Sequence, residues 1–383
     1  MTTWSYKKAG VDIRSIKSSH SEITKLLGST LSLRNGRIGE VITGSGHYAG
    51  VIKLRNNDYL ALHTDGVGTK VLIAQQYSKF DTVGIDCVAM NVNDLICVGA
   101  EPISLVDYIA LKKNNPVLVK EITKGLVKGS KLSDTPIIGG ETAIMPDVIE
   151  GYGNKAFDLA ASAIGIINKR TNMLNRKIKS GDIIIGLRSS GIHSNGATLA
   201  RKVLLEKYSL RKKIYKSKRL GDVLLEPTII YSKAIMDILN NIKSIHGLAH
   251  ITGGAFTKLP RIGSVGFSID LPEPPLIFDL IQRTGNISDK ESFEMIKQLA
   301  ATENLFAGPS TGSVLAALNK TINKLDGKIV LLFGDNAAKY KSIYSKFGVY
   351  EEEEFEKKLK ESNNNCFTCT YSNNNPEDLC KLG

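Results

Sequence analysis

Three acidic residues lie within or directly after apolar segments of the sequence. Asp65 directly follows an apolar strand pattern, Asp94 lies on an apolar helix pattern, and Glu141 follows a strand pattern that ends at Gly139 and Gly140. We expect the three carboxylates to converge at one edge of one sheet, against the alternative that they are unrelated turn residues. Mg²⁺ takes a few such carboxylates together with phosphate oxygens, and it neutralises a phosphoryl group in transfer. The pattern therefore predicts a magnesium-dependent phosphate site.

The glycine-rich segment 65–70 (DGVGTK) begins where the first of these strands ends. Glycine permits a close approach of the backbone, so that amides, a hydroxyl and an amine could face an anionic ligand. The spacing is neither that of a Walker loop nor that of a dinucleotide-binding loop. A tight turn before a basic helix start would look the same, and both interpretations stay open. The candidate nucleotide ligands of this segment are Gly66, Gly68, Thr69 and Lys70.

A predicted helix over residues 82–98 carries polar groups within an otherwise apolar sequence. Asp86 and Asn93 are seven residues apart, so they lie nearly above each other two turns along the helix, and Asp94 flanks them. On most helices this pattern indicates a half-solvated face. Because of the neighbouring motifs, we interpret Asp86 and Asn93 as candidate nucleotide ligands instead.

Two further glycine-containing loops, residues 189–196 (SSGIHSNG) and 250–254 (HITGG), each contain a histidine. The first lies between a predicted strand and a predicted helix, where hydroxyls and helix N-terminal amides bind anions readily. A single histidine is more often structural than catalytic, but a histidine in both loops favours a functional site. The candidate residues are Ser190, His193, Ser194, Asn195, His250, Thr252, Gly253 and Gly254.

The elements that must position these residues alternate between strands and helices, which indicates an α/β (α+β) fold. The first domain is expected to contain strands at 51–54, 59–64, 103–110, 136–138 and 158–167, and helices at 19–27, 82–98 and 116–128. The second is expected to contain a strand at 182–187, a strand and turn at 246–254, and helices at 197–207 and 228–240. A polar stretch separates the two. We predict the boundaries 1–168, 169–288, 289–350 and 351–383.

The chain of 383 residues carries a formal net charge of +12, which would suit a nucleic acid, a membrane surface or a phosphorylated substrate. The densest basic runs, 211–213 and 216–219, contain no aromatic side chains on which bases could stack, so we expect no nucleic acid partner. Neither a signal peptide nor an apolar run of membrane-spanning length is found. We therefore expect a cytoplasmic protein with no membrane partner and no structural disulfide in its body.

Taken together, these motifs resemble those of aminoimidazole ribonucleotide synthetases, also called phosphoribosylformylglycinamidine cyclo-ligases. The resemblance extends nearly unbroken to about residue 285. Residues 44–50 (GSGHYAG) look like an archaeal variant of the family's glycine-rich nucleotide loop. The segments that carry it are residues 6–12, 63–70, 84–86, 93–95, 99–102, 139–142 and 189–196.

The resemblance implies an ATP-dependent cyclisation of formylglycinamidine ribonucleotide to aminoimidazole ribonucleotide in purine biosynthesis. It also implies a two-domain ATP-binding synthetase fold and a homodimer in which the N-terminal sheets form a barrel. Asp65, Asp94 and Glu141 would bind Mg²⁺, Lys70 would contact the ATP phosphates, and His193 would act as an acid, base or orienting group. The remaining nucleotide contacts would come from Gly44, Gly46, His47, Gly139 and Gly140.

By the same resemblance, the ribonucleotide substrate would be bound by the polar residues of the two histidine loops. His250 would hold its ribose phosphate together with the backbone amides of Gly253 and Gly254. Ala255 stands where the family usually has a third glycine.

After residue 288 the chain departs from the family's expected ending. Residues 291–312 and 327–335 resemble the last part of a pyridoxal-phosphate-dependent cysteine synthase, in which Ser310 would face the cofactor. The Schiff-base lysine and phosphate loop of that family have no counterpart, so we expect no pyridoxal phosphate. We expect 289–350 to pack on the second domain and the tail 351–383 to be disordered.

Two other interpretations stay open. A related ATP-dependent enzyme of the same superfamily, such as a selenophosphate synthetase or a thiamine monophosphate kinase, would share many of these motifs. The former needs a reactive cysteine or selenocysteine in its N-terminal glycine loop, and residues 44–50 contain none. Alternatively, the altered C-terminus could belong to a non-catalytic nucleotide-binding fusion protein.

Overall fold

The structure is a computed structural model, and it divides the chain into two compact units. One unit is Ala9–Ser264, and the other combines Met1–Lys8 with Val265–Gly383. The site described below lies entirely within Ala9–Ser264. The segments predicted at 289–350 and 351–383 lie outside the described residues. The structure describes residues 13–44, 46–55, 58–167, 178–215, 217–242, 244–253, 258–259, 261–263, 269 and 274–285.

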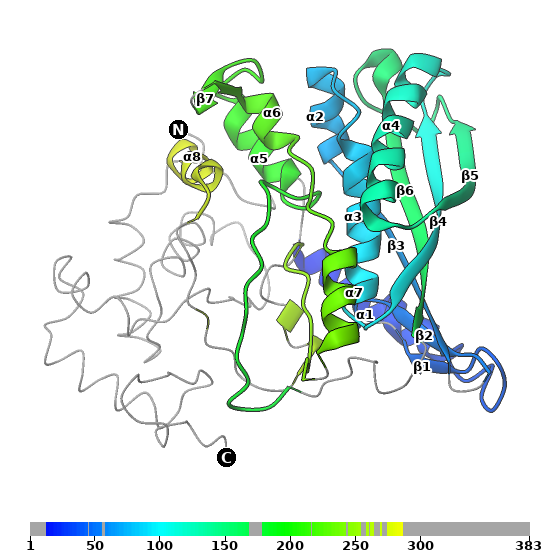
Figure 1. The fold of residues 1–383 in the computed structure, drawn as a ribbon. Helices are drawn as coiled ribbons and strands as arrows, with labels where there is room; N and C mark the ends of the chain where they lie inside the picture. The colour runs from blue at the N-terminus through cyan, green and yellow to red at the C-terminus, as the bar shows by residue number, and fades with distance from the viewer. Residues whose placement is uncertain are drawn as a thin grey trace, which may run out of the picture. The chain divides into compact units, whose positions relative to one another are not determined.

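The first half of the unit Ala9–Ser264 contains a six-stranded sheet and four longer helices (Figure 1). The strands are β1 (Val41–Thr43), β2 (Gly50–Lys53), β3 (Tyr59–Gly66), β4 (Glu101–Leu111), β5 (Ile137–Ile144) and β6 (Phe157–Ile167). The helices are α1 (Ile13–Gly28), α2 (Lys70–Tyr77), α3 (Val83–Ile96) and α4 (Pro116–Ser133), with the short 3-10 helix η1 at Gly153–Lys155.

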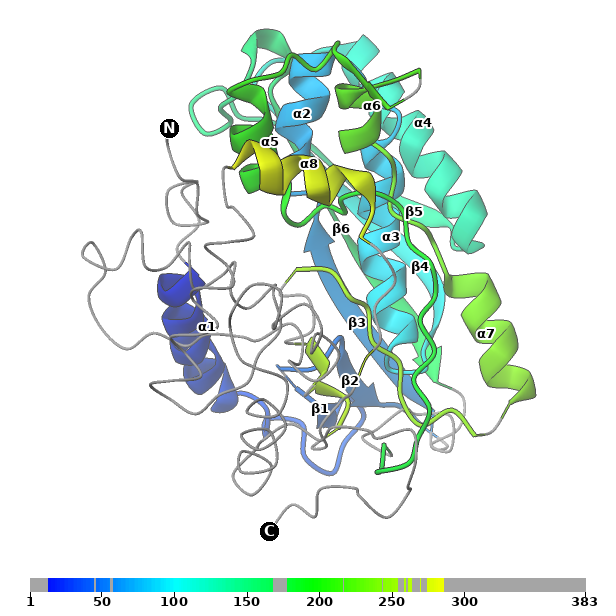
Figure 2. The ribbon, with the colours of Figure 1, turned by 90° about the vertical axis from the view of Figure 1, so that its left-hand side faces the viewer.

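The second half of this unit, described from residue 178 onward, contains shorter elements. They pack on the first half, which is described up to Ile167. These are α5 (Ala197–Leu205), the hairpin β7 (Lys213–Tyr215) and β8 (Lys218–Arg219), α6 (Leu220–Leu224) and α7 (Ser232–Asn241). Helices α5 and α6 lie beside α2, and α7 lies beside α3 and α4 (Figure 2). The remaining helix, α8 (Leu276–Thr284), belongs to the other unit.

The sheet has the order β1-β2-β3-β6-β4-β5 and is antiparallel except between β4 and β5. That parallel pair needs a crossover connection, which α4 supplies. One register row runs across four strands, through Asp65, Ala161, Asp107 and Gly140. This row decides which site residues share a face of the sheet.

Helix α3 forms the centre of the core, because all fourteen of its residues are buried. It packs on β3 and β6 on one side and on α4 on the other. Glycine makes the close helix contact possible: a Cβ atom on Gly84 would lie 2.3 Å from the backbone nitrogen of Leu126, and one on Gly125 would lie 2.5 Å from the carbonyl oxygen of Asp81. The polar side chains of α3 are therefore held in a tightly packed setting.

Several predicted elements are confirmed with small shifts in their ends, but three predictions about strands are wrong. Gly139 and Gly140 lie inside β5 rather than after it. The described residues at 182–187 and 246–253 contain no strand. The apolar run at 183–187 remains exposed, with Ile183 at 88% and Ile185 at 80%. A strand needs a hydrogen-bonded neighbour, and alternation of apolar residues alone does not supply one.

Within the described residues, no helix is long and apolar enough to cross a membrane. Cys87 and Cys97 are both buried and free, as expected for the body of the chain.

Candidate active site

The centre of the candidate site is a buried hydrogen bond between Asp94 and His250. Asp94 comes from α3, His250 comes from the loop of the second half, and His250 Nδ1 lies 2.6 Å from Asp94 Oδ1. Their exposed fractions are 4% and 6%. The other carboxylate oxygen of Asp94 lies 3.7 Å from His63 Nε2. Because the carboxylate accepts from Nδ1, the neutral imidazole keeps a free lone pair on Nε2, which is buried without a protein partner among the described residues.

Asp65 lies near Asp94 at the end of β3, where α3 fixes its backbone. Its N–H donates to Asn91 Oδ1 at 3.0 Å, and Asn91 Nδ2 donates back to its carbonyl oxygen at 3.1 Å. Burial raises the pKa of the Asp65 carboxyl, and the Asp94 carboxylate adds to the increase. Two carboxylates that repel each other in a partly desolvated place form a natural site for a cation.

Glu141 does not join this pair within one chain. Its register neighbours are Tyr108, Ala160 and Gly66, so its side chain shares their face of the sheet. Asp65 precedes Gly66 and therefore points to the opposite face. Strands β3 and β5 are three positions apart in the sheet, which is about 14 Å at the usual strand spacing. The expected convergence of three carboxylates at one edge is thus not found in the single subunit.

In agreement with this separation, the described residues contain no group of three or more His, Cys, Asp or Glu side chains that could hold a metal ion. Sequence analysis assigned all three carboxylates to one sheet edge because it placed a strand end before Glu141. The strand instead continues through Ile144, and alternation along it sends Glu141 to the other face.

Lys70 and Asp86 form a fully buried ion pair rather than ligands for a nucleotide. Lys70 Nζ lies 2.9 Å from Asp86 Oδ2, and both side chains are 0% exposed. The ammonium group also donates to the carbonyl oxygens of Ile192 and Glu226, at 3.3 and 2.8 Å. Asp86 Oδ1 accepts from the N–H and hydroxyl of Thr228. The pair therefore links α2 and α3 to the second half, which corrects the expectation that both residues face the ligand.

Asn93 and Thr69 also connect the two halves of the unit. Asn93 donates to the carbonyl oxygen of Ile229 at 2.9 Å and accepts from the N–H of Tyr231 at 3.0 Å. The hydroxyl groups of Thr69 and Thr198 lie 2.6 Å apart. The predicted nucleotide role of Asn93 is not supported by these contacts, because both ends of its amide are occupied by backbone groups.

His193 lies next to His250, with 5.9 Å between the ring centroids. Its Nε2 atom lies 2.5 Å from the hydroxyl oxygen of Ser189. Burial lowers the pKa of His193 to about 4, and the neighbouring His250, Lys70 and Lys258 add to the decrease. His193 is therefore a neutral imidazole near pH 7, able to accept or share a proton but not charged at rest.

The two loops predicted to bind the ribonucleotide are brought together. Asn195 Oδ1 accepts from the hydroxyl of Thr252 at 2.8 Å and from the N–H of Gly253 at 3.0 Å. A Cβ atom on Gly253 would lie 2.6 Å from the Asn195 side chain, so a larger residue would force that side chain to move. Ser190 donates to the Pro227 carbonyl oxygen. Gly254 and Ala255 lie outside the described residues.

Ser194, like His250, is a member of these loops with a buried polar atom that has no partner among the described residues. Its exposed fraction is 5%, and its hydroxyl has no hydrogen-bond partner among the described residues. A buried hydroxyl without a partner is costly, so this oxygen is suited to a ligand atom.

The glycine-rich loop before β2 brings Tyr48 into the same region. Gly46 has φ of +105°, a conformation that favours glycine, and Gly44 packs against Leu31. The rings of His47 and Tyr48 meet edge to face at 5.8 Å. Gly68, with φ of +62°, also depends on glycine.

Two cations at this site, Lys258 and Arg261, belong to none of the motifs recognised in the sequence. Lys258 Nζ lies 5.7 Å from the centroid of the Tyr48 ring, and Arg261 Cζ lies 5.3 Å from it. Both act electrostatically on Asp94, Asp65 or Cys97 nearby. They lie just after the HITGG loop, so the proximity of two basic residues to that loop was the available signal.

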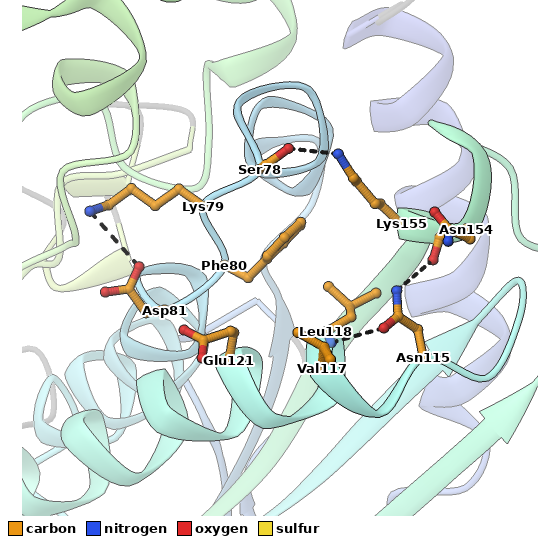
Figure 3. Close-up of a pocket in the computed structure, with 10 residues that line it drawn as sticks. All are labelled: Ser78, Lys79, Phe80, Asp81, Asn115, Val117, Leu118, Glu121, Asn154 and Lys155. Atoms are coloured by element: carbon orange, nitrogen blue, oxygen red, sulfur yellow. Dashed lines mark hydrogen bonds and ion pairs between the residues drawn. The ribbon is translucent and has the colours of Figure 1, made fainter.

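A separate surface hollow of about 560 Å³ lies away from these residues (Figure 3). It lies between the segment that joins α2 to α3 and the start of α4, and its polar groups are tied to one another, as in the bond from Lys155 to Ser78 and the ion pair of Lys79 with Asp81. None of the predicted site residues lines it.

Comparison with known proteins identifies the family of this chain. Two family models match the chain: "AIR synthase related protein, N-terminal domain" over residues 46–167 and "AIR synthase related protein, C-terminal domain" over residues 179–306. The second match continues past residue 288, where sequence analysis ended the family pattern.

Three archaeal relatives show how much of the chain is shared, and each is named phosphoribosylformylglycinamidine cyclo-ligase. The protein of Thermococcus kodakarensis is 45% identical over 326 residues, which cover 85% of this chain and 95% of the relative. That of Saccharolobus solfataricus is 46% identical and covers 77% and 84%. That of Methanocaldococcus jannaschii is 41% identical and covers 86% and 97%. With identity at this level across most of both chains, this chain belongs to the AIR synthase family.

Proposed function

We propose that this chain is a phosphoribosylformylglycinamidine cyclo-ligase, which uses ATP to convert formylglycinamidine ribonucleotide to aminoimidazole ribonucleotide in purine biosynthesis. The observation that carries the proposal is the 45% identity to the Thermococcus kodakarensis protein of that name across 95% of its length. The selenophosphate synthetase, thiamine monophosphate kinase and non-catalytic alternatives have no comparable support. A cytoplasmic location would follow from these substrates.

The reaction has two chemical parts. The terminal phosphoryl group of ATP moves to the formyl oxygen of the substrate, which converts that oxygen into a good leaving group. The ribosyl-bearing nitrogen then attacks the formyl carbon, and phosphate leaves with the oxygen. Each of the two ring nitrogens loses one proton, and a proton moves from the ring CH2 group to the exocyclic nitrogen. The products are aminoimidazole ribonucleotide, ADP and phosphate.

Two features of the site suit the proton step. His193 has a pKa of about 4, so its imidazole is neutral and can accept a proton or a hydrogen bond during ring closure. His250 is held in position by its hydrogen bond to Asp94, and it is only 6% exposed. Its Nε2 atom is buried without a partner among the described residues. We assign His193 to proton transfer and His250 to orientation of the substrate, with Asn195, Thr252 and Gly253 shaping the adjoining loop.

Asp65 and Asp94 fit a magnesium ion bound with the nucleotide. Mg²⁺ usually takes one or two carboxylates plus phosphate oxygens and water, so two carboxylates suffice. The raised pKa of Asp65, caused mainly by burial and partly by Asp94, is the electrostatic cost that such a cation would relieve. When bound, the metal would offset the negative charge of the phosphoryl group in transfer.

A homodimer is supported by the face of the sheet that lies opposite α3. On that face the side chains of Leu62, Val106 and Tyr108 are 45%, 42% and 39% exposed. Exposed apolar groups concentrated on one sheet face favour a protein contact. We propose that two copies meet through this face, and that Glu141 contributes to the nucleotide site from there, towards the second copy.

The direct test is to incubate the purified protein with ATP, Mg²⁺ and formylglycinamidine ribonucleotide, and to measure both aminoimidazole ribonucleotide and ADP. We expect the two products in equal amounts. ADP release without the imidazole product, or no dependence on the ribonucleotide, would reject the proposed activity. Thiamine monophosphate, supplied in a parallel reaction, should yield no product.

A further inference from the structure

The site still lacks a cation for the phosphate groups, because the expected one is fully engaged. An ammonium group has three N–H donors. Those of Lys70 are directed to Asp86, to the carbonyl oxygen of Ile192 and to that of Glu226. With an exposed fraction of 0%, the Lys70 side chain offers no donor to a ligand.

Lys258 has the opposite character. Its exposed fraction is 9%, and within the described ranges it has no hydrogen bond or ion pair, so Asp94 and Asp65 act on it only from a longer distance. Burial lowers the pKa of its ammonium group, while Asp94 and Asp65 act in the other direction. A buried charge without a direct partner is unfavourable unless an opposite charge joins it. An arriving anion would supply that charge.

Arg261 places a second cation at the same spot. Its guanidinium carbon lies 5.3 Å from the Tyr48 ring centroid, and Lys258 Nζ lies 5.7 Å from it. Both cations therefore lie beside the same ring, and repulsion from Arg261 lowers the pKa of Lys258, so a bound anion would stabilise both charges. Tyr48 is 1% exposed, and burial raises the pKa of its hydroxyl.

The location connects these groups to the reaction. Tyr48 belongs to the glycine-rich loop 44–50, and both cations interact electrostatically with groups beside Asp94. A phosphate placed between the cations and the carboxylates would be bound by Lys258 and Arg261 on one side. On the other side, Asp65 and Asp94 would hold a metal ion that offsets part of the negative charge of the phosphate.

We propose that Lys258 and Arg261, positioned over the Tyr48 ring, form the phosphate-binding pair of this site in place of Lys70. The inference rests on the proposed function and extends it to residues that sequence motifs did not single out. The shared chemistry is a phosphate oxyanion. It could belong to ATP or to the ribonucleotide, and the binding arms of the test separate the two.

The test measures binding to the full chain by calorimetry, with two probes. One is a non-hydrolysable ATP analogue with Mg²⁺, and the other is formylglycinamidine ribonucleotide. In Lys258→Met we expect the Kd for one probe to rise about tenfold or more, as expected when a charged hydrogen bond is lost, while the Kd for the other stays within about twofold. Lys258→Arg should restore most of the affinity. The matched control is Lys233→Met, which removes an exposed lysine on α7.

Thermal unfolding distinguishes phosphate binding from a purely structural role, because the loss of a structurally important lysine would lower the Tm. The Tm of ligand-free Lys258→Met should equal or exceed that of the wild type, because an unpaired buried charge has been removed. The rise in Tm caused by the affected probe should shrink. Arg261→Gln provides an independent variant, and we expect a weaker effect on the same probe.

Unchanged affinity for both probes in Lys258→Met and Arg261→Gln would overturn the pair, and so would a lowered Tm with normal binding. Failure of the proposed function looks different: the wild type would make no aminoimidazole ribonucleotide, although its binding of the ATP analogue still depended on Lys258. A wild type that binds neither probe would reject both.

Discussion

His250 Nδ1 lies 2.6 Å from Asp94 Oδ1, although 156 residues separate the two along the chain. The bond joins the most deeply buried helix of the first half to a loop of the second half. It also fixes which nitrogen of His250 carries the proton, and the other nitrogen is buried without a partner in the described part of the chain. Because both groups are buried, solvent weakens this hydrogen bond less than it would weaken the same bond at the surface.

The first prediction concerns this bond. In Asp94→Asn we expect kcat to fall on the order of 100-fold or more, because the amide neither binds Mg²⁺ well nor holds the same His250 tautomer. Steady-state measurement of imidazole product with saturating ATP checks this. The control Asp81→Asn removes a half-exposed carboxylate outside the site and should be nearly silent. Activity of Asp94→Asn above half of the wild-type value would contradict the assignment.

The second prediction separates a structural lysine from a ligand-binding one. Lys70→Met leaves Asp86 buried without its ion-pair partner, so the free energy of unfolding should fall by about 3–5 kcal/mol. Urea denaturation measures this loss. Lys79→Met removes an exposed lysine near Asp81 and should cost at most about 1 kcal/mol. If Lys70→Met remains folded and its Kd for the ATP analogue rises strongly, Lys70 contacts the phosphates after all.

The third prediction tests the close contact of α3 with α4. A Cβ atom on Gly84 would lie 2.3 Å from the backbone nitrogen of Leu126, so Gly84→Ala must push the two helices apart. We expect a loss of about 1–3 kcal/mol in stability, and lower activity because Asp94 lies on the same helix. Gly139→Ala is the control, since nothing lies within 4 Å of its added Cβ atom. Equal stability of the two variants would contradict this account of the packing.

The fourth prediction follows from the pKa of His193, which burial lowers to about 4. An unfolded chain takes up this proton near pH 6.5, whereas the folded chain does so only near 4. As pH falls from 6.5 to 4, His193 therefore reduces the stability of the fold. His193→Gln should make the loss of stability between pH 7 and pH 5 smaller, by about 1–2 kcal/mol.

Denaturation of His193→Gln and the wild type at both pH values measures that difference. His20→Gln, which changes an exposed histidine on α1, is the control and should lose as much stability as the wild type. If His193→Gln also lost as much, the low pKa of His193 would be refuted.

The fifth prediction tests the exposed face of the sheet. Val106→Glu puts a charge on that face and should convert a dimer to a monomer, which sedimentation analysis would detect. Val127→Glu makes the same change on α4, where Val127 is 44% exposed, and should leave the oligomeric state unchanged. A wild type that sediments as a monomer at micromolar concentration would reject the proposed dimer.

Sequence patterns located many elements because their signals are local. The apolar periodicity of α3 and α4 and the alternation in β6 depend on neighbouring residues only, and these elements were predicted with ends shifted by a few residues. The run at 183–187 shows the limit of this approach. It has the composition of a strand, but strand formation depends on a partner that local composition does not reveal.

The motif types by themselves identified the family and the chemistry to be sought, and relatives at 41–46% identity confirm the family. Only the tertiary structure decided which of these side chains meet. Strand order and register put Glu141 on the face opposite Asp65, and burial paired Lys70 with Asp86 while it brought Lys258 and Arg261 to Tyr48. These outcomes depend on contacts between residues far apart in the chain, and the strength of each charge depends on the surroundings that those contacts create.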